Sequence, residues 1–216
     1  MSATTEATAT GSADRRAFLI RKLHSLSGLV PVGAFMCFHL FENNSAWGPD
    51  GPKQFGETVD KIAHLPFLLP MEVLGIWLPI LFHAIFGFVI ILEGKPNAVH
   101  WPHGRNWLYL MQRVTGVLAF LFIVYHFWNF RWRKEEFAAA PFDDVAATLS
   151  NPVNLWVYVV GIAACVFHLA NGISGFLFSW GFTVGERSKR LAGFACAGIG
   201  AGVFVLGMRA LFAFVR

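Results

Sequence analysis

Among the residue types of this chain, histidine can take part in the widest range of chemistry. Of eight histidines, four lie deep inside apolar stretches, at His39, His83, His126 and His168. An imidazole in such a stretch is costly unless it is hydrogen-bonded or binds a ligand. One such histidine alone is equally well explained as a hydrogen-bonded interior residue. Four, each on a different apolar segment, indicate a shared chemical role.

Metal ligation by pairs of imidazoles is the chemistry that fits these histidines. Imidazole is a usual protein ligand of haem iron, and two on one iron give a closed centre suited to electron transfer, so the pattern predicts two b-type haems. With the N-terminus inside, His83 and His168 lie about 15 Å and 18 Å from the inner ends of their helices. For His39 and His126 the distances are about 22 Å and 28 Å. Depth therefore pairs His83 with His168 at an inner haem, and His39 with His126 at an outer haem. Reversing the topology would exchange the sides and keep the pairs.

Small residues recur on the same helix faces as these histidines, at spacings of 4, 7 or 11 residues. Such spacings bring positions to one side of a helix, and close approach inside a membrane uses small residues. The candidates for haem contact on this basis are Gly28, Thr115, Gly161 and Gly172. Packing of helix on helix is the alternative explanation.

Polar residues near the segment ends supply further candidates. His24 and Ser25 lie at an inner end next to Arg21 and Lys22, and Arg113 lies at another. This cationic rim would neutralise haem propionates or dock a soluble partner. Ordinary positive-inside anchoring is the other interpretation. Glu72 precedes His83 by 11 residues and lies near an outer end, where it would exchange protons with a quinone. A solvated carboxylate at a loop edge is the other interpretation of Glu72.

A membrane protein must position these residues, because the chain is apolar throughout. Of its 216 residues, 56% are hydrophobic and 14% are charged, against roughly a quarter charged in a soluble domain. We expect residues 1–14 to form a disordered polar tail and residues 15–216 a single domain. Five apolar segments are long enough to cross a bilayer core of about 30 Å, and they lie near residues 23–43, 70–93, 107–130, 154–180 and 191–213. The prediction is an all-α integral membrane protein, a five-helix bundle that holds two haems.

The charges indicate an orientation and argue against some functions. With the N-terminus in the cytoplasm, ten of the 17 Lys and Arg fall on the inner side, in the sense of the positive-inside rule. No cationic run is interleaved with aromatic residues, which argues against nucleic-acid binding. The three cysteines lie in apolar stretches, with neither CxxC nor CxxCH, so neither a disulfide nor covalent haem is indicated.

Four stretches of the chain resemble, in order, one known family. They are RKLHSLSGLVPVGAFMCFHL at 21–40, LPILFHAIFG at 78–87, NWLYLMQRVTGVLAFLFIVYHFWN at 106–129 and FHLANGISGFLFSWG at 167–181. The family is the single-chain, dihaem cytochrome b anchor of succinate:menaquinone oxidoreductases and fumarate reductases. The similarity extends over nearly the whole chain after residue 15, and is greatest to the succinate dehydrogenase branch of Gram-positive and related bacteria.

The resemblance implies a role for each part of the site. The four histidines within apolar stretches would be the axial ligands of two haems b. An iron–sulfur subunit would dock beside the inner haem and carry a flavoprotein subunit that oxidises succinate. Electrons would then pass to menaquinone in the bacterial cytoplasmic membrane. His24 and Ser25 match positions near the inner haem propionates, with Tyr109 as a further candidate.

One position departs from the family pattern. Fumarate reductases that move protons across the membrane carry a glutamate two residues before the ligand of the fourth helix, where this chain has Val166. Valine carries no proton, so we expect succinate oxidation, with Glu72 as the candidate proton donor at an outer quinone site.

Other interpretations stay open at this point. A fumarate reductase anchor would work in the reverse direction. A dihaem cytochrome of another respiratory dehydrogenase would lack the HSxxGxxPxG and QRxTG segments found here. A transporter subunit would bind no haem and would more often show helices broken at the bilayer midplane. The chain has no flavin- or nucleotide-binding motif, so it is not expected to oxidise succinate alone.

Overall fold

Five long helical spans build the protein. The computed structural model describes residues 2–95, 98–133, 137 and 139–215, with side chains from Asp14 onward; the expected outer limits Met1 and Arg216 lie outside the described residues. The five spans are long and apolar enough to cross a membrane, and the described residues contain no β-strand. This confirms the expected all-α membrane bundle. Numbered in chain order, spans 1 to 5 are Asp14–Ala46, Leu68–Glu93, Gly104–Arg131, Pro152–Ser179 and Glu186–Ala213.

Each of the first three spans is made of α-helix joined to a short π-helical segment. The α-helices are α1 (Ser2–Ser27), α2 (Ala34–Asn43), α3 (Gly51–Ala63), α4 (Leu68–Glu72), α5 (Leu78–Glu93), α6 (Gly104–His126), α8 (Pro141–Leu149), α9 (Pro152–Ser179) and α10 (Glu186–Ala213). The π-helical segments are η1 (Gly28–Gly33), η3 (Val73–Trp77) and η4 (Phe127–Arg131), and η2 (Asn44–Ala46) is a 3₁₀ turn.

The segment η1 has a local cause in the sequence. Pro31 lies inside it, and proline both lacks an N–H and clashes with the carbonyl four residues before it. A π-helical turn absorbs this disruption without ending the helix. The helix register before η1 is therefore displaced from the register after it.

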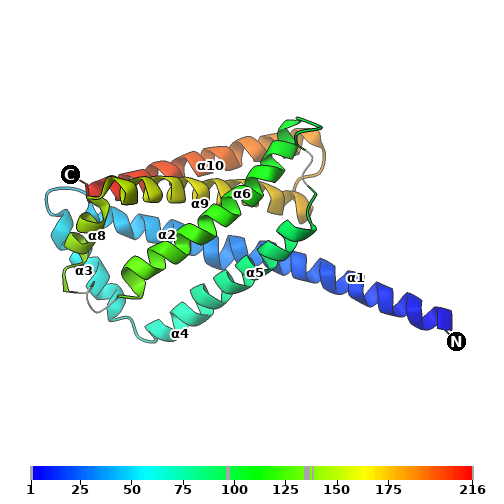
Figure 1. The fold of residues 1–216 in the computed structure, drawn as a ribbon, viewed down its shortest axis with the longest axis horizontal. Coiled ribbons are helices and arrows are strands. Elements are labelled where there is room, and N and C mark those ends of the chain that lie inside the picture. The colour runs from blue at the N-terminus through cyan, green and yellow to red at the C-terminus, as the bar shows by residue number, and fades with distance from the viewer. Residues whose placement is uncertain (1, 96–97, 134–136, 138, 216) are drawn as a thin grey trace.

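Span 4 is the centre of the packing. Its helix α9 lies against α6 on one side and α10 on the other, while α1 packs on α5, and α2 on α10 (Figure 1). Large apolar side chains on the outer faces of the spans remain exposed, among them Phe41, Leu81, Leu121 and Val205. Such exposure fits a bundle whose surroundings are lipid.

The two ends of the bundle differ in construction. One, which we call the cap end, carries α3, α8 and the C-terminus; the other, the loop end, carries the α5–α6 and α9–α10 connections (Figure 1). We expected no helix between spans 1 and 2 or between spans 3 and 4, but α3 and α8 fold there. The core beneath them includes Ala46, Phe55, Phe130, Val145, Leu149 and Phe214. Apolar residues spaced along both short helices explain why they fold onto the bundle.

The N-terminal segment also differs from the expectation. Helix α1 begins at Ser2 and projects beyond the loop end (Figure 1), where we expected a disordered tail over residues 1–14. Extending an existing helix needs no new nucleus, and alanine, frequent in this segment, favours the helix.

Candidate functional site

The four histidines lie as two pairs inside the bundle. The rings of His83 on α5 and His168 on α9 have centroids 6.0 Å apart, at an interplanar angle of 89°. The rings of His39 on α2 and His126 on α6 have centroids 5.6 Å apart, at 73°. These are the combinations that helix depth predicted. We call them the loop-end pair and the cap-end pair.

Main-chain carbonyls hold both members of the loop-end pair. His83 Nδ1 lies 2.9 Å from the carbonyl oxygen of His24, and His168 Nδ1 lies 3.0 Å from that of Gln112. A carbonyl oxygen only accepts, so each Nδ1 is the protonated donor and each Nε2 keeps its lone pair. Both rings therefore present the nitrogen that a metal would use.

Side chains surround the cap-end pair instead. His126 Nδ1 lies 3.4 Å from the hydroxyl oxygen of Tyr158. The Asn43 amide nitrogen lies 3.4 Å from both ring nitrogens of His39 and donates a shorter bond, of 2.6 Å, to the His39 carbonyl oxygen. Phe130 packs edge-on against His126. No main-chain acceptor is found for either ring of this pair among the described residues.

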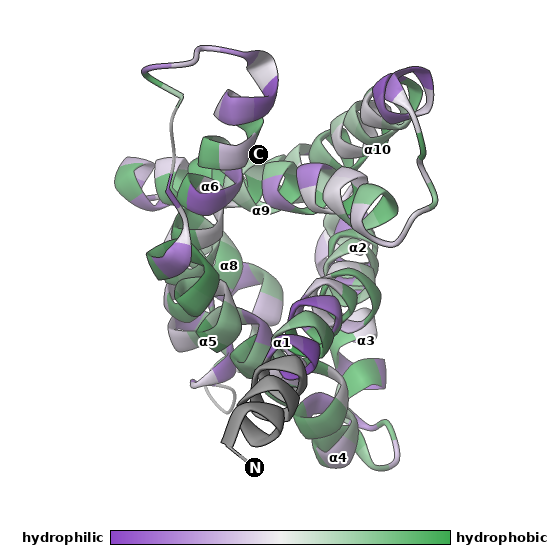
Figure 2. Ribbon diagram, turned by 90° about the vertical axis from the view of Figure 1, so that its right-hand side faces the viewer, coloured by the Kyte–Doolittle hydropathy of each residue, from purple (hydrophilic) through white to green (hydrophobic). Residues whose placement is uncertain are grey.

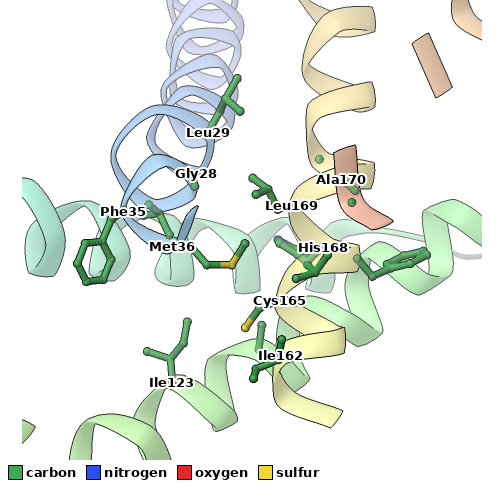
Figure 3. A pocket seen from close by; sticks show the side chains of 18 of the residues that line it. Gly28, Leu29, Phe35, Met36, Ile123, Ile162, Cys165, His168, Leu169 and Ala170 are labelled. Carbon is green, nitrogen blue, oxygen red and sulfur yellow. The ribbon is translucent and has the colours of Figure 1, made fainter. Parts of the chain in front are cut away.

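A long apolar cavity joins the two pairs. Its volume is about 2410 Å³, and all four histidines line it. Residues of all five spans line this cavity, and the ribbons of the spans form a ring when the bundle is seen from its loop end (Figure 2). Close to His168 its wall is formed by side chains such as Met36, Ile123 and Cys165 (Figure 3). The cavity can therefore hold a large, mostly apolar ligand between the imidazoles.

Glycines bring the helix backbones close to the loop-end imidazoles. A Cβ on Gly28 would overlap the ring of His83, and a Cβ on Gly116 would lie 2.9 Å from His168 Cε1. Gly172 also lines the cavity, beside the Gln112 amide. Gly28 and Gly116 therefore accept no side chain without displacing a histidine.

Two residues expected to contact haem, Thr115 and Gly161, do not line the cavity. The Thr115 hydroxyl donates 2.6 Å to the Met111 carbonyl oxygen of its own helix, and Thr115 does not line the cavity, whereas its neighbour Gly116 does. Gly161 packs against the ring of Phe122 and is also absent from the cavity wall. The candidate on α6 is thus Gly116, and Gly161 serves helix packing.

Polar side chains gather beside the loop-end pair. The ring of His24 stacks on that of His83, with centroids 4.1 Å apart and planes 8° from parallel. The Arg113 guanidinium lies 3.4 Å from the centre of the Tyr109 ring. Ser25 accepts a hydrogen bond of 3.1 Å from the indole of Trp180. His24 Nδ1 and Arg113 Nε are buried and, within the described part of the chain, have no hydrogen-bond partner.

Glu72 is not a solvated carboxylate. It forms two hydrogen bonds with Arg131, at 3.0 Å from Nε to Oε1 and 2.5 Å from Nη2 to Oε2, and only 15% of its side chain is exposed. The two residues line the cap end of the cavity. Glu72 ends α4 just before η3, and Arg131 ends η4, and these two π-helical segments meet where Trp77 packs edge-on against Phe127. Arg131 was missed as a site residue, although its charge at the same end as Glu72 was a usable signal.

Fold and site together define a class of protein. The chain is a multi-pass, α-helical membrane protein whose interior presents two facing pairs of imidazoles across an apolar cavity.

Comparison with known proteins gives the family. The family described as succinate dehydrogenase/fumarate reductase transmembrane subunit matches residues 92–208. The succinate dehydrogenase cytochrome b558 subunit of Bacillus subtilis (strain 168) is 38% identical over 200 residues, which cover 93% of this chain and 98% of that protein. The chain therefore belongs to the membrane-anchor subunits of the succinate dehydrogenase/fumarate reductase family, which confirms the resemblance seen in its sequence.

Proposed function

We propose that this chain anchors a succinate dehydrogenase in the bacterial cytoplasmic membrane and carries electrons from the iron–sulfur subunit, through two haems b, to menaquinone. The observation that carries the proposal is the pair of facing imidazoles at each of two levels of one apolar cavity. Succinate oxidation itself belongs to the flavoprotein subunit.

The imidazole pairs fit a metal held inside a macrocycle. A metal–nitrogen bond is about 2 Å long, and the bound nitrogen lies about 1 Å from the centre of its ring. Two imidazoles on opposite sides of one metal therefore have centroids about 6 Å apart, close to the observed 6.0 Å and 5.6 Å. Among the described residues, no three His, Cys, Asp or Glu side chains group to hold a bare ion. A haem brings its own in-plane donors and needs only two ligands from the protein. Bound there, each haem would supply a one-electron redox centre.

The loop-end polar group fits the anionic edge of a haem. His24 and Arg113 would take up propionate oxygens with the ring and guanidinium nitrogens that lack other partners, since charged carboxylates bind arginine strongly. Tyr109 orients Arg113, and Ser25 is held beside them by Trp180. Gly28 and Gly172 would allow the macrocycle to approach the helix backbones.

A quinone site would lie at the cap end. Glu72 would hand protons to the reduced quinone, and Arg131 would hold the Glu72 carboxylate at the cavity wall. Val166 lines the cavity beside α10, two residues before His168, so this position offers no proton carrier. The absence of a carboxylate there favours succinate oxidation over the reverse reaction, which other members of the family could carry out.

The loop end would face the cytoplasm. This orientation puts the N-terminus inside and ten of the 17 Lys and Arg on the inner side. The loop-end pair would then be the inner one, next to the docked iron–sulfur subunit, and the cap-end pair the outer one. Protons for quinone reduction at the cap end would come from outside.

A difference spectrum of the tagged chain, purified gently in detergent with its partners, tests the proposal. We expect a b-type band when succinate is added, and a haem content near two per chain. Haem that dithionite reduces and succinate does not, in a preparation that contains both soluble subunits, would contradict the succinate dehydrogenase assignment. Folded protein without haem would contradict the ligand assignment of all four histidines.

A further inference from the structure

Tyr158 places a hydroxyl group against the ring of His126. It lies on α9 and is only 5% exposed, and its hydroxyl oxygen is 3.4 Å from His126 Nδ1. The two rings meet edge to face, with centroids 5.8 Å apart. Phe122 and Phe130 pack against both of them. The hydroxyl is therefore held against the imidazole by a packed aromatic cluster.

The loop-end pair shows what this contact does. There, each Nδ1 donates to a carbonyl oxygen, at 2.9 Å and 3.0 Å, which fixes the tautomer with Nε2 free. At His126 the Tyr158 hydroxyl oxygen lies in the equivalent place, 3.4 Å from Nδ1. The contact at Nδ1 is thus made by main chain at one level of the cavity and by a side chain at the other.

We propose that Tyr158 is a positioning residue for His126, resting on the haem assignment of the proposed function. Its hydroxyl accepts the Nδ1–H of His126, which sets the tautomer and ring orientation and directs Nε2 into the cavity. An acceptor at Nδ1 makes the imidazole a more basic ligand. A more basic ligand favours the oxidised metal, so Tyr158 lowers the reduction potential of the cap-end centre.

The chain offers a matched control in Tyr125. Its hydroxyl donates to Asn154 Oδ1 at 2.7 Å, and its ring lies 6.2 Å from that of Tyr158. Tyr125 therefore belongs to the same aromatic cluster without a hydrogen bond to His126. Tyr125→Phe removes a hydroxyl of the same kind from the same surroundings and keeps the Tyr158 contact.

The experiment is a redox titration of the assembled complex, with haem content and low-spin EPR signals measured on wild type, Tyr158→Phe and Tyr125→Phe. In Tyr158→Phe we expect full haem content, an upward shift of one of the two midpoint potentials and a change in one EPR signal. Tyr125→Phe should match wild type in all three.

The outcomes separate this inference from the function it rests on. Wild-type protein without haem overturns both. Haem present, with Tyr158→Phe identical to wild type in both potentials and in EPR, overturns the role of Tyr158 alone. Equal shifts in the two variants would assign the effect to the aromatic packing and overturn the hydrogen-bond argument.

Discussion

The two histidine pairs have similar ring geometry but different supports. At the loop end, carbonyl oxygens of α1 and α6 hold His83 and His168, and Gly28 and Gly116 let the backbones approach the rings. At the cap end, His126 is held by Tyr158 within an aromatic cluster. A main-chain acceptor survives any single substitution, whereas a side-chain acceptor does not. The cap-end pair is therefore the one whose properties point substitutions can tune.

The surroundings of the cap-end pair are also packed differently from those of the loop-end pair. The cap end has a packed core under α3 and α8 and a partly buried ion pair between Glu72 and Arg131. The loop end has an ion pair between Arg21 and Glu93 whose side chains are more than half exposed. Exposed pairs contribute little to stability, so the cap end is the better-stabilised end. An open, polar loop end suits the docking of soluble partners.

Among the changes that test the difference between the two pairs, removing one of the histidines should have the largest effect. We expect His83→Ala to lower the haem content from about two to about one per chain, because one imidazole does not close the six-coordinate centre. His126→Ala should do the same at the other pair, and pyridine haemochrome assays measure both. His64→Ala, at a side chain 76% exposed, is the control. Loss of both haems in either single variant would show that the pairs are not separable sites.

Creating a cavity in the cap-end core should have the second-largest effect. Phe55 is 5% exposed and packs edge-on against Phe214, so Phe55→Ala should cost about 3–5 kcal/mol of stability. Thermal unfolding in detergent measures this loss. EPR should show the cap-end signal altered and the loop-end signal kept. Phe41→Ala, at a position 65% exposed and outside the cavity lining, should change little, and equal disturbance of both signals would contradict separate supports.

Much of this architecture followed from the sequence because burial by lipid leaves a simple pattern. Each of the five spans overlaps the expected range, since long apolar runs are fixed by membrane thickness. The proximity of the histidines within each pair followed from helix rise alone. The short helices α3 and α8 were missed because each has few apolar residues. They are stable only when those residues pack against the end of the bundle.

Helix register is where two of the spacing arguments failed. The 11-residue relation of Gly28 to His39 crosses η1, and in the structure Gly28 lies against His83 instead. The same spacing between Glu72 and His83 crosses η3. A π-helical turn carries a hydrogen bond from i to i+5, so a 3.6-residue period no longer relates the two sides. Hydrogen-bond partners such as Tyr158 and Arg131 come from other helices, and a single sequence does not reveal that pairing.

The Glu72–Arg131 pair provides a functional test of the cap end. We expect Glu72→Gln to slow succinate-driven menaquinone reduction by about 10²-fold, because the amide carries no proton to the quinone, while both haems stay bound. Stopped-flow reduction of the haems by succinate should stay at the wild-type rate. Glu57→Gln, on the nearby helix α3 with its side chain 52% exposed, is the matched control. Wild-type turnover in Glu72→Gln would remove Glu72 from the proton route.

The smallest expected effect concerns the loop-end backbone. A Cβ on Gly28 would overlap the His83 ring, so Gly28→Ala should displace that ring and cost about 1–3 kcal/mol, as overpacking does. The spectrum of the loop-end centre should shift and that of the cap-end centre should not. Gly56→Ala provides the contrast, since nothing lies within 4 Å of a Cβ there, and replacing a glycine inside a helix by alanine stabilises by about 1 kcal/mol. A shift confined to the cap-end signal in Gly28→Ala would mean that the close backbone approach at Gly28 supports the cap-end pair. Unchanged spectra with full haem would mean that α1 and α5 move apart easily, and the loop-end pair would then be held by its hydrogen bonds alone.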